Sequence, residues 1–158
     1  MKKDSGGNYG LADTWRLNHR VNLLLLDHLS AEQLAFAANP RARSIADQFA
    51  HIHNVRILWL EHTAPKLAAS LKKIGKGTAT KKVLQEALES SSEAIGNFIA
   101  EAEQSGTMKG SKRGPIAFFG YALAHEAHHR GQIIVHLKHA KLPIDPMVGF
   151  SLWEWQKI

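Results

Sequence analysis

The sequence predicts an all-α protein, an antiparallel four-helix bundle followed by a C-terminal tail that contains tryptophan. Three observations support this prediction. Apolar residues recur every three or four positions in four long segments. Short stretches rich in glycine, proline, serine or lysine separate these segments. No segment shows the sustained apolar and polar alternation of a strand, so strands are not expected.

The first two helices are predicted before the proline at position 65. One covers residues 11–34 and ends in the stretch 38–41, which contains asparagine and proline. The other begins near Ser44, whose side chain suits a helix N-cap. Asp47 lies three residues further on, where a negative charge stabilises a helix start. This second helix is expected to end before Pro65.

The third and fourth helices are predicted over residues 80–104 and 115–140. The loop 105–114 between them is rich in glycine, serine and lysine. Pro115 suits the first turn of the fourth helix, and Pro143 limits its extension. Four helices of about 20 residues with short connections favour a bundle, whose interior is a common place for metal sites. Two tryptophans in the tail are expected to pack on the bundle or on a partner subunit.

The composition restricts the kinds of protein that this chain can be. Its 158 residues show no break in composition, so a single domain over residues 1–158 is expected. There is no cysteine, which excludes disulfides and thiolate metal ligands and leaves nitrogen and oxygen as possible ligands. The N-terminal residues lack the apolar stretch of a secretory signal, and no apolar run approaches the ~20 residues of a membrane span. A cytoplasmic location is therefore expected.

The net charge of +6 and the pI near 9.7 raise the question of nucleic-acid binding. The basic residues gather in two different connections, around positions 72–82 and 109–113. Successive connections of an up-and-down bundle lie at opposite ends, so a single basic patch is not expected. We therefore expect no nucleic-acid partner.

Histidine is the residue type that distinguishes this chain from an ordinary bundle. Ten are present, and the run His125-Glu126-Ala127-His128-His129 lies inside the fourth predicted helix. Residues four apart on a helix project about 40° from each other, so His125 and His129 are able to chelate one ion. His128 lies about 60° back from His125 and is less well placed. The sequence thus predicts two metal ligands on this helix.

A third ligand is expected on the second predicted helix. His51 is the best inward candidate because it lies in line with Val55 and Leu58. His53 is interpreted as peripheral, and His62 lies near the helix end. Three further histidines rank lower as inward candidates: His19, His28 and His136.

Two motifs resemble the DinB-like superfamily. One is the segment 49–59, in which a histidine precedes a tryptophan by eight residues. The other is the segment 124–133, in which the histidine-rich run continues into Arg-Gly-Gln. The resemblance covers nearly the whole chain. It implies a four-helix bundle with a three-histidine metal site formed by His51, His125 and His129.

The resemblance also implies a metal, a partner and an activity. Such sites hold zinc or nickel most often, with iron, manganese and copper as alternatives. Members commonly form homodimers, and those with established chemistry are mostly transferases or isomerases that depend on a low-molecular-weight thiol. The family name refers to induction by DNA damage and does not imply DNA binding. We therefore expect a metalloenzyme, with a thiol and a small electrophile as possible partners.

The donor set agrees with catalysis, because three imidazoles leave a coordination position open and structural zinc sites usually have four protein ligands. Other functions remain open. The run at 125–129 matches the HExxH pattern of zinc proteases, with Glu126 as general base and Glu154 in the range of a third ligand. Glu126 and His129 also form one Glu-x-x-His pair, but di-iron bundles need a second pair. An ion pair is the preferred interpretation of Glu126 and Arg130. A non-catalytic binding or stress-response module is the main alternative.

Overall fold

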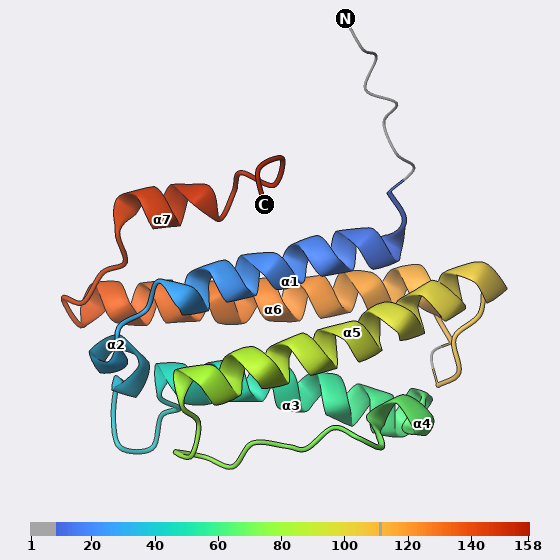
Figure 1. The fold of residues 1–158 in the computed structure, drawn as a ribbon, viewed down its shortest axis with the longest axis horizontal. Coiled ribbons are helices and arrows are strands. Elements are labelled where there is room, and N and C mark those ends of the chain that lie inside the picture. Colours follow the sequence, from blue (N-terminus) through green and yellow to red (C-terminus); the bar gives the residue numbers. More distant parts are fainter. Residues whose placement is uncertain (1–8, 111) are drawn as a thin grey trace, which may run out of the picture.

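The computed structural model describes residues 9–110 and 112–158, and this part of the chain is all-α, as predicted (Figure 1). No helix in the described ranges is long and apolar enough to cross a membrane. Seven helices lie within these ranges: α1 (Leu11–Asp27), α2 (Ala31–Ala35), α3 (Ile45–Thr63), α4 (Pro65–Ala68), α5 (Lys81–Ser105), α6 (Gly114–His139) and α7 (Pro146–Ser151).

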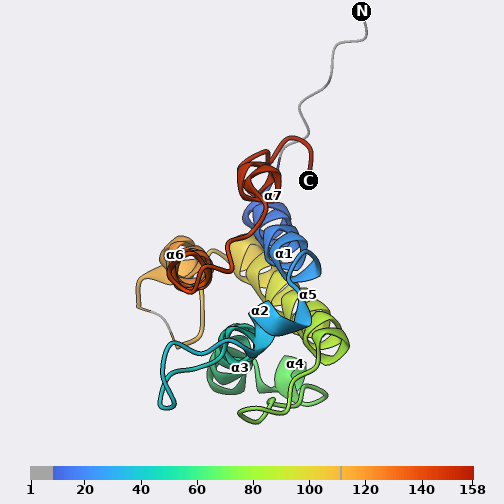
Figure 2. The same cartoon turned by 90° about the vertical axis from the view of Figure 1, so that its left-hand side faces the viewer.

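The four long helices form a bundle in the order α1, α5, α3, α6 around its axis (Figure 2). Helices α1 and α5 run antiparallel. The backbone N–H of Leu11 donates to the Glu103 carboxylate at one end of this pair, at 3.1 Å. At the other end, the ammonium group of Lys81 donates to the carbonyl of Asp27 at 2.7 Å. The predicted helical bundle is therefore confirmed.

The connection between α3 and α5 differs from the short connections that we expected. Residues 69–80 run back along the bundle, so α3 and α5 point in the same direction (Figure 1). The Asn54 side chain makes two hydrogen bonds of 2.9 Å with the backbone N–H and carbonyl of Ile74. The Asp47 carboxylate accepts a bond of 2.7 Å from the N–H of Gly77. These contacts hold the segment 69–80, hereafter the return segment, against α3.

The single helix predicted over residues 11–34 is wrong, because the chain forms two helices there. Helix α1 ends at Asp27, and α2 begins after Ser30. The hydroxyl of Ser30 accepts from the N–H of Gln33 at 3.1 Å, and the Gln33 side chain accepts from the N–H of Ser30 at 2.8 Å. This capping box starts a new helix inside a continuous apolar pattern.

The other predicted helix starts are confirmed. Ser44 caps α3, with its hydroxyl accepting from the N–H of Asp47 at 3.0 Å. Thr80 caps α5 in the same way, and Pro115 lies in the first turn of α6. Local end signals predicted two of these starts, through the N-cap serine of α3 and the first-turn proline of α6.

The tail contains a short helix, α7, that the sequence did not predict. The two tryptophans of the tail follow α7 and differ in burial. Trp155 is partly buried and packs against the core, whereas 82% of Trp153 is exposed. The expectation that tail tryptophans pack on the bundle is therefore confirmed for Trp155 alone.

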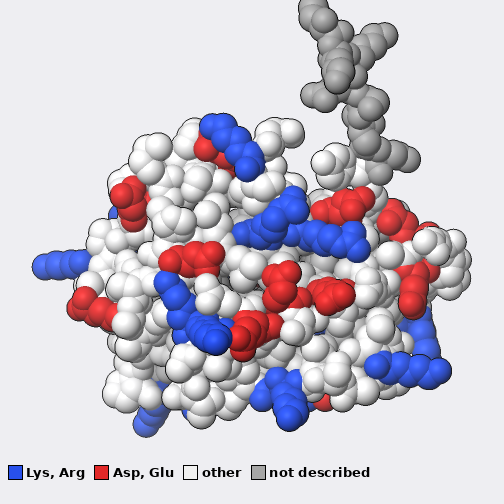
Figure 3. Space-filling view, in the orientation of Figure 1, with Lys and Arg blue, Asp and Glu red and all other residues white. Residues whose placement is uncertain are grey.

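The interior divides along the bundle axis into two apolar clusters and a polar layer. One cluster includes Leu25, Phe49 and Ile133, and the other includes Trp15 and Phe118. Buried polar residues occupy the intermediate positions of the same helices: Asn18, Asn22, Arg56, Ser91 and Glu126. On the molecular face of Figure 3, basic and acidic side chains are interspersed, so that face has no patch of a single charge.

Candidate metal centre

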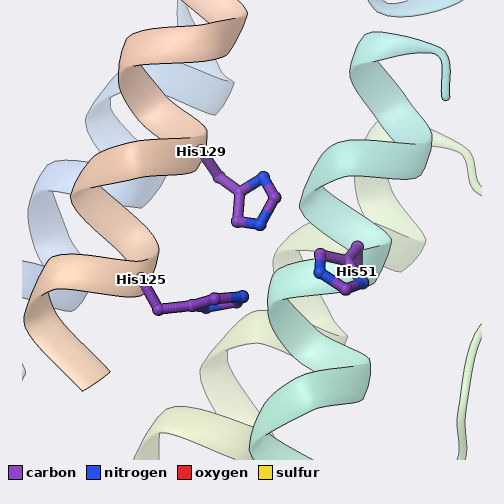
Figure 4. A group of neighbouring side chains, drawn as sticks. All are labelled: His51, His125 and His129. Atoms are coloured by element: carbon purple, nitrogen blue, oxygen red, sulfur yellow. The ribbon is translucent and has the colours of Figure 1, made fainter. Parts of the chain in front are cut away.

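Three histidines from two helices point toward one another between α3 and α6 (Figure 4). His51 comes from α3, while His125 and His129 come from successive turns of α6. One ring nitrogen from each lies within 4.8 Å of the other two. The ring centroid of His129 lies 4.7 Å from that of His51 and 4.6 Å from that of His125. The structure therefore brings together the three residues that the sequence singled out.

Aromatic side chains border one side of this group, hereafter the histidine cluster. The Tyr121 ring lies one turn before His125 and stacks on it, with centroids 6.0 Å apart and an interplanar angle of 24°. The ring of Trp59 in turn packs edge-on against the Tyr121 ring, with centroids 5.3 Å apart. His129 is buried, whereas His51 and His125 are partly exposed. Solvent therefore reaches the cluster.

All three imidazoles are neutral at neutral pH. Burial, followed by the neighbouring rings of His125 and His51, lowers the pKa of His129 to about 4. Burial also lowers the pKa of His51, and the Arg43 guanidinium adds to this effect. The pKa of His125 is lowered mainly by burial, although the adjacent Glu126 carboxylate acts in the opposite direction. Neutral imidazoles have the lone pairs that a metal requires.

A glutamine orients the most buried of the three rings. The side-chain carbonyl of Gln48 accepts from Nδ1 of His129 at 3.4 Å. The amide of Gln48 donates to Nδ1 of His136 at 3.3 Å, which matches this assignment of its oxygen and nitrogen. With the proton on Nδ1, the lone pair of His129 lies on Nε2. The sequence had not assigned this role to Gln48, since α3 must lie antiparallel to α6 before the two residues meet.

Within the described residues, His51 and His125 have no hydrogen-bonded protein partner. Their nitrogens and Nε2 of His129 form a donor set made only of imidazole nitrogen. Such a set suits zinc, nickel, copper or iron(II). The residues present therefore fit a divalent transition metal, and the identity of that metal is open.

The remaining candidate histidines have other contacts. His53 is buried rather than peripheral, which corrects the sequence interpretation, and its Nε2 bonds the carbonyl of Lys72 at 2.9 Å. His19 contacts the Glu89 carboxylate at 2.8 Å. None of these residues joins the histidine cluster. The lower ranking of these histidines therefore agrees with the structure.

A buried ion pair lies next to the histidine cluster. The Arg56 guanidinium contacts the Glu126 carboxylate at 2.7 and 3.1 Å, and both side chains are almost completely buried. Asn18 and Asn22 each donate to the same carboxylate at 2.7 Å. Arg130, the partner considered from the sequence, instead donates to the side-chain oxygen Oδ1 of Asn22 at 2.6 Å. Glu126 thus forms the ion pair between helices that the sequence analysis preferred, but its partner is Arg56 and not Arg130.

This environment argues against the protease and di-iron alternatives. Both oxygens of Glu126 accept hydrogen bonds, and the side chain is 2% exposed, so it has no free face for a metal-bound water. The arginine holds the pKa of Glu126 below its ordinary value, although burial acts in the opposite direction. Glu154 lies after α7, pairs with Lys157, and is not part of the histidine cluster. Among the described residues, the candidate ligands are therefore the three imidazoles of the histidine cluster.

Comparison with known proteins identifies the family. The model of the DinB family matches residues 3–143, which is most of the chain. No curated protein and no solved structure shows significant similarity to the chain. Since the matched region includes α1, α3, α5 and α6 together with the histidine cluster, the chain belongs to the DinB family.

Proposed function

We propose that His51, His125 and His129 bind one divalent transition metal ion, and that the protein is a metal-dependent enzyme transferring a thiol to a small electrophile. The observation that supports metal binding is the convergence of three neutral imidazoles, with ligand atoms within 4.8 Å of one another. Zinc–nitrogen bonds of about 2.0–2.1 Å put nitrogens about 3.3 Å apart in a tetrahedral site. The observed limit of 4.8 Å exceeds that spacing by about 1.5 Å, which is the closure that metal binding would require.

The chain's own residues prepare the site in three ways. The three imidazoles stay neutral because burial lowers the pKa of each. Gln48 fixes the ring of His129 through its Nδ1, as outer-shell acceptors do at metal sites. Arg56 keeps the Glu126 carboxylate in the polar layer and away from the metal position. A bound divalent ion would act as a Lewis acid and hold a thiol as its thiolate, the nucleophilic form.

The thiol has to come from outside the protein, because the chain has no cysteine. The main alternative is a non-catalytic module in which a metal only stabilises the bundle. Access to the cluster favours catalysis over this alternative. His51 and His125 are partly exposed, and His51 lines a cavity of about 540 Å³. A purely structural ion would be expected in a closed, four-ligand site.

The first test is elemental analysis of protein purified without added metal. We expect about one ion per chain in the parent and a loss of metal in the His51→Ala and His125→Ala variants. The matched control is His53→Ala, which removes an imidazole from the same helix outside the cluster. Undiminished metal in both cluster variants would overturn the metal proposal.

The second test concerns catalysis. Metal-loaded protein is incubated with a thiol and a model electrophile such as chlorodinitrobenzene, and thiol consumption is followed. Faster consumption than with His125→Ala protein supports thiol transfer. Stoichiometric metal without any turnover over a panel of thiols and electrophiles supports the non-catalytic module.

A further inference from the structure

A second recognition element lies directly beside the histidine cluster. The cavity of about 540 Å³ is lined by three basic side chains, Arg41, Arg43 and Lys76, and by His51. Arg41 and Arg43 precede α3, whereas Lys76 belongs to the return segment. Residues far apart in the sequence therefore supply positive charge to one space, hereafter the basic cavity.

Within the described residues, one acidic side chain, Asp47, offsets part of the positive charge of the basic cavity. In the described ranges, no ion pair joins Arg41, Arg43 or Lys76 to an acidic side chain. Asp47 is the acidic residue in the lining. Its two oxygens already accept from the N–H groups of Gly77, at 2.7 Å, and of Ser44, at 3.3 Å. Three cations therefore face the cavity against one carboxylate that is already hydrogen-bonded.

The backbone walls of the basic cavity are held in place. On one side, Asn54 bonds both the N–H and the carbonyl of Ile74. On the other side, the Asn39 side chain accepts from the N–H groups of Arg41 and Ala42, at 2.9 and 3.0 Å. Preorganised walls reduce the entropy cost of binding a small ligand. The cavity is therefore a formed feature and does not depend on a loop closing over it.

The basic cavity and the histidine cluster share a side chain. His51 lines the cavity and contributes a nitrogen to the cluster. A molecule of modest length is thus able to occupy the cavity with one end and reach the cluster with the other.

We propose that the basic cavity binds an oxyanion, a carboxylate or a phosphate, of a small thiol substrate whose sulfur reaches the metal. Guanidinium groups recognise both oxyanions through paired hydrogen bonds. The inference rests on the proposed function for the sulfur end, while the anion end depends only on the basic cavity. It predicts that the protein selects anionic thiols over neutral thiols of equal length.

The test uses three matched probes: mercaptohexanoate, which has both ends, mercaptohexanol, which lacks the anion, and hexanoate, which lacks the sulfur. Isothermal titration calorimetry measures their binding to zinc-loaded and to metal-free protein. We expect mercaptohexanoate to bind zinc-loaded protein about tenfold more tightly than mercaptohexanol, as for a charge-assisted hydrogen bond. Competition by propionate or by inorganic phosphate then identifies the preferred oxyanion.

The double variant Arg41→Gln/Arg43→Gln should reduce this preference to about onefold, since only the charge-assisted bonds are removed. Both side chains are exposed, so the variant is expected to fold, which circular dichroism checks. The control Lys82→Gln/Lys138→Gln removes the same charge from exposed positions outside the cavity and should leave the preference intact.

The outcomes separate the two proposals. If zinc does not bind, the proposed function fails, while hexanoate binding to metal-free parent, lost in the arginine variant, still supports the basic cavity. If zinc binds and mercaptohexanoate shows no preference over mercaptohexanol, the basic-cavity proposal is overturned and the metal proposal stands. A preference that persists in the arginine variant also overturns it.

Discussion

The polar layer and the histidine cluster adjoin each other on α3 and α6, but the protein satisfies most polar atoms of the first and leaves most of those of the second without partners among the described residues. In the polar layer, both oxygens of Glu126 are occupied by Arg56 and two asparagines. In the cluster, His51 and His125 have no hydrogen-bonded partner among the described residues, and they are partly exposed. On α6, the fully hydrogen-bonded Glu126 and the available His125 are adjacent residues.

This difference separates structure from binding. A buried charge that is fully hydrogen-bonded fixes how helices pack, and it has no capacity left for a ligand. Neutral nitrogens that converge without protein partners do little for the fold in the absence of an ion. We therefore expect variants in the polar layer to change stability and variants in the cluster to change metal binding.

The largest effect should follow from Glu126→Leu. This change leaves the buried Arg56 guanidinium without a counter-charge, which costs about 3–5 kcal/mol of unfolding free energy. Urea denaturation of metal-free protein measures the loss. The double variant Arg56→Met/Glu126→Leu should recover most of it, because neither charge remains. A single-variant loss below about 1 kcal/mol, the range of exposed ion pairs, would contradict a structural role for the pair.

The next effect concerns Gln48→Met, which keeps the side-chain volume but removes the acceptor for Nδ1 of His129. Loss of such an outer-shell partner is expected to weaken metal affinity about 10–100-fold. Competition with a chelator measures the affinity, and nitrogen NMR of the His129 ring reports its tautomer. The Gln48→Glu variant keeps an acceptor and should retain affinity. Equal affinity of parent and Gln48→Met would remove Gln48 from the site.

Acid should affect the two regions in different pH windows. Because the pKa of His129 is lowered from 6.5 to about 4, unfolded protein binds more protons than folded protein between these values. Metal-free protein should therefore lose stability as pH falls from 6.5 toward 4, by about 2 kcal/mol at pH 5. The lowered pKa of Glu126 gives stability that is lost only below 4.5. The measurement is the urea midpoint from pH 7.5 to 3.5 in the parent and in His129→Asn. The same pH dependence in both proteins contradicts the prediction.

The smallest effect should come from Ser44→Ala at the start of α3. Loss of the N-cap bond to Asp47 is expected to cost about 1 kcal/mol. The cost falls on a helix that supplies both Arg56 and His51, so stability decreases while metal affinity of the folded protein is unchanged. Thermal unfolding and chelator competition on the same samples measure both quantities. A large loss of affinity would mean that the cap also positions His51.

The helix starts and the three candidate ligands could be predicted largely from the sequence. The helix start at Ser44 follows from local capping, and the convergence of His125 and His129 follows from the helical repeat. His51 was the best inward candidate on its helix, and the family resemblance then included it in the site. The homodimer that the same resemblance implies stays a prediction.

The sequence did not predict features that depend on contacts between distant segments. Arg56 lies between the buried Ile52 and Leu60, and a charge in such an apolar stripe was the available signal of a buried partner. Gln48 gains its role only through the antiparallel packing of α3 on α6. The basic cavity requires the return segment to run along α3, which no local pattern encodes.

The return segment also has a consequence for synthesis on the ribosome. Since α3 and α5 point the same way, α1 packs mainly on α5 rather than on the helix that follows it. The apolar faces of α1 and α3 therefore lack their principal partner until residue 105 of 158 has emerged. Non-local pairing of this kind slows folding relative to an up-and-down bundle. The nascent chain thus carries uncovered apolar helices for longer than its helical composition suggests.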